Sequence, residues 1–300
     1  KSATFRTADV VGLDTLAHVV NTMRDTLPHD PWHRYFTVPD WMQGLIDAGA
    51  LGEKVKRGVY QKINGEIHVL DLATQSYRLS EGNVDEDIKH LLKFSGSVEK
   101  FVVLRSAEKQ QAQFLWAVFR DLFHYCAVQL EDIADNARDL DLAVRWGFGW
   151  NQGPFEIWQA AGWKQLVEWI EQDIASGKSM SSTPLPQWVH KIAQSNMQSI
   201  HTPQGSYAPA FDQLQPRSRL SVYRRQLFPD RLIGETAEYG KTIFENDAIR
   251  MWHLDDDDQV AILSFNTKMH TIGIEVLQSV QQAIQEAEQN WRALVIWQTE

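Results

Sequence analysis

The sequence predicts a mainly α protein in which one helical unit is used twice, followed by a short segment that contains strands. The first observation is a repeat: the phenylalanine, glycine and aliphatic positions of Phe5–Leu13 recur in Phe155–Trp163, at an offset of 150 residues. The second is helical hydrophobic spacing over about 108–134. The third is a change at about residue 247, after which apolar residues alternate as they do in strands.

The repeat extends beyond its first motif with a small slip in register. Val38–Met42 matches Leu185–Val189, and Gly58–Tyr60 matches Gly205–Tyr207, both at an offset of 147 residues. An ordered set of apolar, proline, glycine and aromatic matches indicates one packing unit used twice. The first copy has no counterpart of the 108–134 helix, so we expect that copy to be truncated at its N-terminus.

The first copy reads as helices followed by a hairpin. Apolar residues recur at helical spacing over 13–26 and over 40–48. Residues 63–71 alternate and contain the turn dipeptide Asn64–Gly65, which predicts a small hairpin. The acidic stretch 83–92 then predicts a short helix.

The pattern in the last part of the chain predicts a hairpin, a helix and a strand. Apolar residues alternate over 249–253 and 260–264, and the acidic run Asp255–Asp258 between them reads as a solvated turn. A metal site in this run is the alternative, although metal loops space their ligands along a loop that contains glycine. A 17-residue amphipathic helix follows from Ile274. The run 293–297 is apolar on both faces, as in a parallel strand covered on both sides, so we expect the chain to end inside a domain.

The composition narrows the class of protein. A net charge of −10 argues against nucleic acid or an anionic membrane as the main partner. There is no apolar run long enough to span a membrane, and the single Cys126 lies in an apolar helical pattern, so we expect a cytoplasmic protein. Five arginines between Arg217 and Arg231 form either a solvated linker or a phosphate-binding surface.

The sequence contains no complete set of catalytic or metal-ligating residues. It has no glycine-rich dinucleotide motif, P-loop, zinc motif or nucleophile elbow. Four aspartates lie near predicted helix starts, where capping is their ordinary role: Asp9, Asp14, Asp139 and Asp141. We therefore predict no catalytic residue and no metal ligand in this chain.

Three segments in order resemble the C-terminal domain of the 3-hydroxyacyl-CoA dehydrogenases. That family carries a run G-F-P-x-G-P-F-x-L-x-D-x-x-G-L-D. Its second half is matched by Phe5–Asp14, and its first half is matched in the second copy by Gly147–Glu156. The closing run of the family, G-x-K-T-G-x-G-F-Y, resembles Gly52–Tyr60, in which Lys56 replaces a glycine. The second copy keeps little of this closing run.

Residues 260–300 resemble the opening of the enoyl-CoA hydratase (crotonase) fold, through Ala261–His270 and Arg292–Ile296. Multifunctional β-oxidation enzymes join these two activities, and the order found here resembles the bacterial type. The resemblance thus implies a mainly α fold of two tandem dehydrogenase C-terminal helical domains, followed by a β-hairpin, helix and strand from the start of a crotonase α/β fold. The implied segments are a first dehydrogenase domain at 1–66, a connector at 67–107, a second dehydrogenase domain at 108–215, a linker at 216–245 and part of a hydratase domain at 246–300.

The resemblance implies oxidation of L-3-hydroxyacyl-CoA to 3-ketoacyl-CoA with NAD as cofactor and acyl-CoA as substrate. The catalytic His–Glu dyad of the family lies in a Rossmann domain that would precede Lys1. We therefore expect the chain to be inactive alone, and its partners to be the Rossmann and hydratase portions of a parent enzyme. A homo-oligomer is also possible, whereas nucleic acid and a membrane span are not expected.

Four residues are carried over from the resemblance as candidate binding residues. Lys54 matches a lysine that reaches the NAD cofactor, and its alternative role is that of an exposed turn lysine. Lys268, Met269 and His270 match a loop that approaches CoA, and their alternative role is that of a surface loop. The rival function is an all-α interaction or scaffold module that has no active site.

Overall fold

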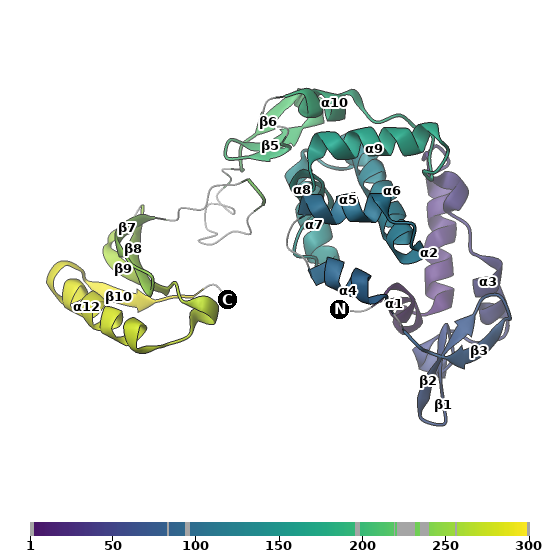
Figure 1. Cartoon of the computed structure of the whole chain (residues 1–300), viewed down its shortest axis with the longest axis horizontal. Helices are drawn as coiled ribbons and strands as arrows, with labels where there is room; N and C mark the ends of the chain where they lie inside the picture. Colours follow the sequence, from purple (N-terminus) through teal and green to yellow (C-terminus); the bar gives the residue numbers. More distant parts are fainter. Residues whose placement is uncertain are drawn as a thin grey trace. The chain divides into compact units, whose positions relative to one another are not determined.

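The computed structural model describes residues 3–82, 84–93, 97–195, 199–218, 220, 232–234, 240–255 and 257–298, except for the side chains of Lys93 and Met269. The chain forms two compact units (Figure 1). The first comprises residues 1–202 and 206–215, and the second comprises residues 216–300 together with 203–205.

The first part of the first unit consists of helices followed by a three-stranded sheet. Its elements are α1 (Thr4–Val11), α2 (Leu13–Thr26), η1 (His33–Tyr35), α3 (Asp40–Asp47), η2 (Glu53–Val55), β1 (Tyr60–Ile63), β2 (Glu66–Asp71) and β3 (Ser76–Leu79). The sheet is antiparallel in the order β1-β2-β3. Asn64 and Gly65 both have positive φ and connect β1 to β2, as a type I′ hairpin turn requires, which confirms the predicted hairpin. Leu13, Leu45 and Val59 lie in the core of this part.

The second part of the first unit is built around one long helix. Its elements are α4 (Glu86–Lys93), α5 (Ser97–Ser106), α6 (Gln110–Ile133), α7 (Ala137–Phe148), α8 (Pro154–Ala160), α9 (Trp163–Ala175), α10 (Gln187–Gln194), β4 (His201–Thr202), β5 (Gly205–Ala208), η3 (Pro209–Phe211) and β6 (Gln213–Gln215). The predicted 108–134 helix is confirmed as α6. The ring of Phe123 on α6 stacks on Trp158 at 5.4 Å, and Trp158 stacks on Trp163 at 4.3 Å, so α6 covers α8 and the start of α9.

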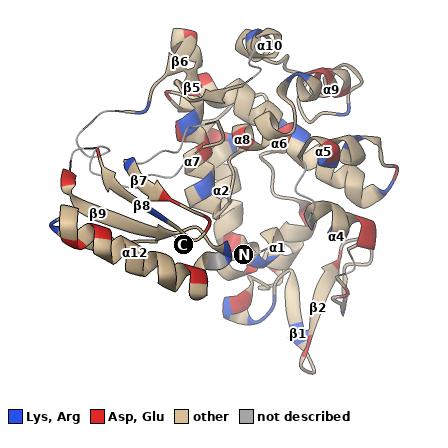
Figure 2. Cartoon of the chain, turned by 60° about the vertical axis from the view of Figure 1, so that its left-hand side comes forward, with Lys and Arg blue, Asp and Glu red and all other residues tan. Residues whose placement is uncertain are grey.

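The second unit is a four-stranded sheet with one helix. Its elements are β7 (Lys241–Glu245), β8 (Ile249–Leu254), β9 (Asp257–Phe265), η4 (Lys268–His270), α12 (Ile274–Asn290) and β10 (Ala293–Ile296), and the sheet order is β10-β9-β8-β7. Helix α12 packs on the sheet through Val276 and Ala283, whereas its acidic residues such as Glu288 are exposed (Figure 2). Strand β10 is parallel to β9, as predicted. It lies at the edge of the described sheet with Ile296 58% exposed, so the described residues cover it only in part, and the expected cover on both faces stays a prediction.

The prediction of a mainly α fold is wrong. The described residues form ten strands in three sheets, so the molecule combines helices with a sheet in each of its parts. Several of these strands have only two to four residues, as in His201–Thr202 and Ser76–Leu79. Such strands fall below the length at which hydrophobic period identifies them. The same sheets contradict the all-α architecture of the rival scaffold module.

The two parts of the first unit share an order of elements. In each, a short helix ends at a glycine with positive φ, a longer helix follows at once, and a third helix begins directly after a proline. The glycines are Gly12 and Gly162, with φ of 107° and 96°. The prolines are Pro39 and Pro186, with φ of −62° and −59°. A small three-stranded sheet then closes each part.

In each part of the first unit, a backbone hydrogen bond shows where the closing three-stranded sheet begins. These bonds align the two sheets differently from the repeat found in the sequence. The N–H of Leu70 donates to the carbonyl of Val59 at 2.8 Å, and the N–H of Tyr207 donates to the carbonyl of Ile200 at 2.9 Å. Val59 therefore corresponds to Ile200, at the residue before the first strand. The pairing of Gly58–Tyr60 with Gly205–Tyr207 is not supported, because the hairpin of the second part is shorter.

Candidate functional site

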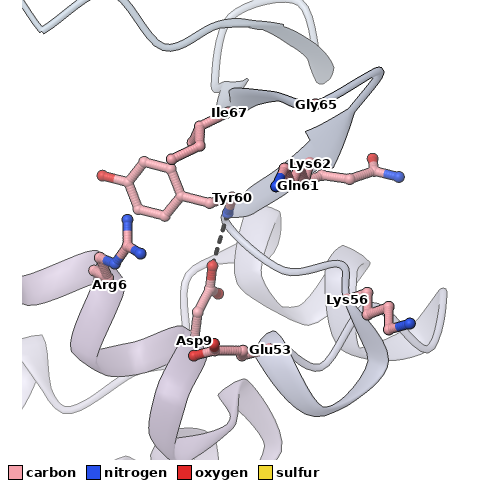
Figure 3. A pocket seen from close by; sticks show the side chains of 9 residues that line it. All are labelled: Arg6, Asp9, Glu53, Lys56, Tyr60, Gln61, Lys62, Gly65 and Ile67. Atoms are coloured by element: carbon pink, nitrogen blue, oxygen red, sulfur yellow. Dashed lines mark hydrogen bonds between the residues drawn. The ribbon is translucent and has the colours of Figure 1, made fainter.

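Asp9 joins the first helix to the first strand. Its side chain is buried, and its two carboxylate oxygens accept the backbone N–H groups of Val59 at 2.8 Å and Tyr60 at 2.7 Å (Figure 3). Asp9 lies in the second half of α1, and α2 begins after Gly12 with no side-chain cap, so Asp9 does not cap a helix start as the sequence suggested. It fixes the start of β1 against α1 instead. In the second part, Gln159 does the same by accepting the N–H groups of Ile200 and His201.

Two glycines allow the loop before β1 to lie against Asp9. A Cβ atom on Gly52 would lie 2.2 Å from the backbone oxygen of Asp9, and a Cβ atom on Gly58 would lie 2.2 Å from its Oδ1. Gly52 also has a φ of 118°, which side chains rarely adopt. The spacing of these glycines in the sequence therefore reflects the close approach of the loop to α1.

Lys54 lies in this loop and forms an ion pair with Asp14 at the start of α2. Its Nζ lies 3.1 Å from Oδ1 and 3.0 Å from Oδ2 of Asp14, and both side chains are about half exposed. The Lys54 hydrogen bond lowers the pKa of Asp14 below its ordinary value. Gly12 lies under the pair, since a Cβ there would lie 3.4 Å from Nζ of Lys54. The site thus presents an exposed ammonium group beside a helix N-terminus, a combination that suits an anionic ligand.

A cavity of about 720 Å³ lies beside the same loop. It is lined by Arg6, Asp9, Glu53, Lys56, Tyr60, Gln61, Lys62, Gly65 and Ile67, which come from α1, η2 and the β1–β2 hairpin (Figure 3). Lys54 is not among the lining residues. The sequence did not point to this cavity, because its residues come from separate elements that only the fold brings together.

The predicted CoA loop forms η4 in the second unit. Lys268 is exposed, and the ring Nδ1 of His270 lies 2.8 Å from the carbonyl oxygen of Phe265. His270 has a φ of 49°, in the left-handed region. The side chain of Met269 lies outside the described part of the chain. Lys54, in contrast, belongs to the first unit.

A buried Ser–His–Asp arrangement was missed by the sequence analysis. Oδ2 of Asp141 lies 2.8 Å from Nε2 of His201, and the hydroxyl of Ser206 lies 2.8 Å from Nδ1. All three residues are at most 2% exposed, so no substrate reaches the serine. Asp141 also accepts the N–H groups of Phe155 and Glu156 at the start of α8. The arrangement therefore caps α8 and anchors a strand, whereas Asp9 anchors a strand alone.

Neither a metal site nor a membrane span is found in the described residues. No group of three or more histidine, cysteine, aspartate or glutamate side chains among them could hold a metal ion. In the acidic run, Asp257 and Asp258 belong to β9, and Asp256 lies outside the described residues. Of the predicted arginine stretch, Arg217 is described, whereas Arg219, Arg224, Arg225 and Arg231 are not. No described helix combines the length and the apolar character that crossing a membrane requires.

Comparison with known proteins identifies the class to which this site is related. Residues 1–62 match the family model of the 3-hydroxyacyl-CoA dehydrogenase, C-terminal domain. This range contains Asp9, Asp14 and Lys54, together with both glycines that approach Asp9.

The relatives agree with this match. The chain is 30% identical over 296 residues to a probable 3-hydroxyacyl-CoA dehydrogenase of Bacillus subtilis, which covers 99% of this chain and 36% of that protein. It is 20% identical over 303 residues to a protein of Rickettsia prowazekii named a fatty acid oxidation complex trifunctional enzyme, covering 96% of this chain and 34% of that protein. The chain therefore spans about a third of the length of these relatives and is homologous to 3-hydroxyacyl-CoA dehydrogenases. The alignments run through both units, so the sheets lie in the shared region.

Proposed function

We propose that this chain carries the C-terminal dehydrogenase part of an enzyme that oxidises L-3-hydroxyacyl-CoA to 3-ketoacyl-CoA in fatty-acid oxidation. The observation that carries the proposal is the match of residues 1–62, because it covers the whole joint at which Gly52 and Gly58 approach Asp9. The names of the relatives support the choice of pathway.

Lys54 is the residue that we propose to contact the NAD cofactor. Its ammonium group is exposed and needs only to leave Asp14, a surface ion pair of small energy, to meet an anionic group. NAD, when bound, accepts the hydride that leaves the substrate carbon. The sequence has no glycine-rich dinucleotide turn. We therefore propose that this chain contributes one lysine contact to the cofactor and not the loop that binds its pyrophosphate.

The proposal extends to the second copy, the C-terminal segment, the binding partners and the cellular compartment. Residues 108–215 are a second copy of the domain that lacks the cofactor lysine, and residues 246–300 form the opening of a hydratase domain in which Lys268, Met269 and His270 approach CoA. The partners are acyl-CoA, a nucleotide-binding domain and the rest of a hydratase, in the same chain or another, with a homo-oligomer as a further possibility. The proposed compartment is the cytoplasm, with which the buried thiol of Cys126 is compatible.

Titration of NADH against the purified 300-residue chain tests this proposal. We expect weak binding that is lost in Lys54→Ala and kept in Lys164→Ala, which removes an exposed lysine from α9. We also expect no oxidation of L-3-hydroxyacyl-CoA, since the 300 residues contain no dinucleotide turn. Equal NADH binding by the two variants would show that Lys54 does not contact the cofactor. Oxidation of L-3-hydroxyacyl-CoA by the isolated chain would disprove its proposed inactivity.

A further inference from the structure

Three cationic side chains line the cavity beside Asp9. Arg6 comes from α1, Lys56 from the turn after η2 and Lys62 from β1 (Figure 3). Within the described residues none of the three forms a hydrogen bond or an ion pair with another side chain. The chain as a whole carries a charge of −10, so a cavity whose lining has more cationic than acidic residues is unusual for it.

Two of these cations occupy positions that local structure disfavours. Arg6 lies in the first turn of α1, where the helix dipole opposes a positive charge. Lys56 has a φ of 59°, in the left-handed region that side chains other than glycine, asparagine and aspartate avoid. The dehydrogenase motif that this loop resembles has a glycine at this position. Lys56 ends η2 in this conformation, as Asp212 ends η3, and a lysine at such a position is a starting point for a hypothesis of function.

The acidic residues of the cavity wall do not cancel this charge. Asp9 contributes one formal negative charge, and its two oxygens accept the N–H groups of Val59 and Tyr60. Glu53 is the one other acidic lining residue. The wall therefore retains a positive balance, which a bound anion would neutralise.

The wall also has an apolar part. Ile67 is 44% exposed and lies opposite Lys62 in the hairpin register, so the two side chains share one face of the hairpin. Tyr60 lies two residues before Lys62 on the same strand and lines the cavity with it. A ligand that combines an anionic group with a less polar body would contact both parts of the wall.

We propose that this cavity is a binding site for the phosphate groups of an organic phosphate, held by Arg6, Lys56 and Lys62. Arginine and lysine are the side chains that proteins use for phosphate, the first through a planar fork and the second as a point charge. Lys54 does not line this cavity, and its ammonium group forms an ion pair with Asp14. The proposed phosphate site does not depend on whether Lys54 contacts NAD.

Calorimetric titration of the 300-residue chain with inorganic pyrophosphate tests the site. We expect binding that weakens as salt is raised. Arg6→Gln, Lys62→Gln and Lys56→Gly should each weaken it by about two- to five-fold, the range for exposed ion pairs. Lys56→Gly is the most informative variant, because glycine accepts the left-handed backbone and the fold should remain intact. Glu53→Gln should strengthen binding by a similar factor, about two- to five-fold.

Two matched variants separate this site from other sources of binding. Lys164→Gln removes an exposed lysine from α9 and should leave pyrophosphate affinity unchanged. Lys54→Gln removes the lysine of the proposed cofactor contact, so it measures how much of the pyrophosphate binding that lysine contributes. The proposal is overturned if the chain does not bind pyrophosphate, or if Lys54→Gln alone abolishes binding. It is also overturned if the Arg6, Lys56 and Lys62 variants bind as tightly as Lys164→Gln.

Discussion

The carboxylate of Asp9 lies so close to Gly58 that a Cβ atom at position 58 would stand 2.2 Å from Oδ1. This approach allows the two carboxylate oxygens to accept the N–H groups of Val59 and Tyr60. The first helix, the loop that carries Lys54 and the first strand are thereby held as one piece. The geometry of the proposed cofactor contact depends on this joint.

Gly58→Ala should destabilise the first unit. The added methyl group overlaps a buried carboxylate that is held by two hydrogen bonds, so either the loop or Asp9 must move. We expect a loss of about 2–4 kcal/mol in the free energy of unfolding, measured by urea titration. Gly44→Ala is the control, because Gly44 lies in α3 with open space around its Cβ position. That variant should gain about 0.5–1 kcal/mol, and a similar loss in both would contradict the account.

Asp14 should titrate below its ordinary pKa of 3.8 because Lys54 donates to its carboxylate. A depressed folded pKa contributes stability that is present above the unfolded pKa and is lost as the pH falls through the folded value. Carboxyl carbon shifts measured by NMR should show a midpoint below 3.8, and Lys54→Ala should move this midpoint upwards. A midpoint that does not respond to Lys54→Ala would show that the ion pair does not form in solution.

Asp141→Ala should be among the most destabilising substitutions in the chain. It removes the acceptor of two backbone N–H groups and leaves His201 without its buried partner. The expected loss is about 3–5 kcal/mol, against less than about 1 kcal/mol for Asp139→Ala on the same helix. A serine-directed fluorophosphonate should not label Ser206, which is 2% exposed. Labelling would mean that the buried arrangement is reactive.

The sequence predicts elements best where their pattern is long or their turn chemistry is specific. The 24-residue helix α6 has an apolar stripe over its whole length, and the Asn64–Gly65 turn defines its hairpin. The parallel strand β10 follows from its apolar run. The fold class failed because the short strands around His201 and Ser76 have too few residues for a period.

The candidate site is predictable only in part for a related reason. Lys54 stands out through a motif that is local in sequence, so it could be placed before the structure was known. Asp9 could not be understood in this way, because its partners Val59 and Tyr60 lie about fifty residues away. The cavity of Arg6, Lys56 and Lys62 depends on the same folding of the loop onto α1. No local sequence pattern predicts that these three residues line one cavity, because only the fold brings them together.

The most direct test of the proposed function uses the complete product of the gene that encodes this chain. Its NAD-dependent oxidation of L-3-hydroxyacyl-CoA should be measured in the wild type, in Lys54→Ala and in the control Lys164→Ala. We predict activity in all three, with the KM for NAD raised by about five- to thirty-fold in Lys54→Ala alone, as expected for the loss of roughly 1–2 kcal/mol. An absence of NAD-dependent oxidation in the wild type, or an unchanged KM for NAD in Lys54→Ala, would contradict the account.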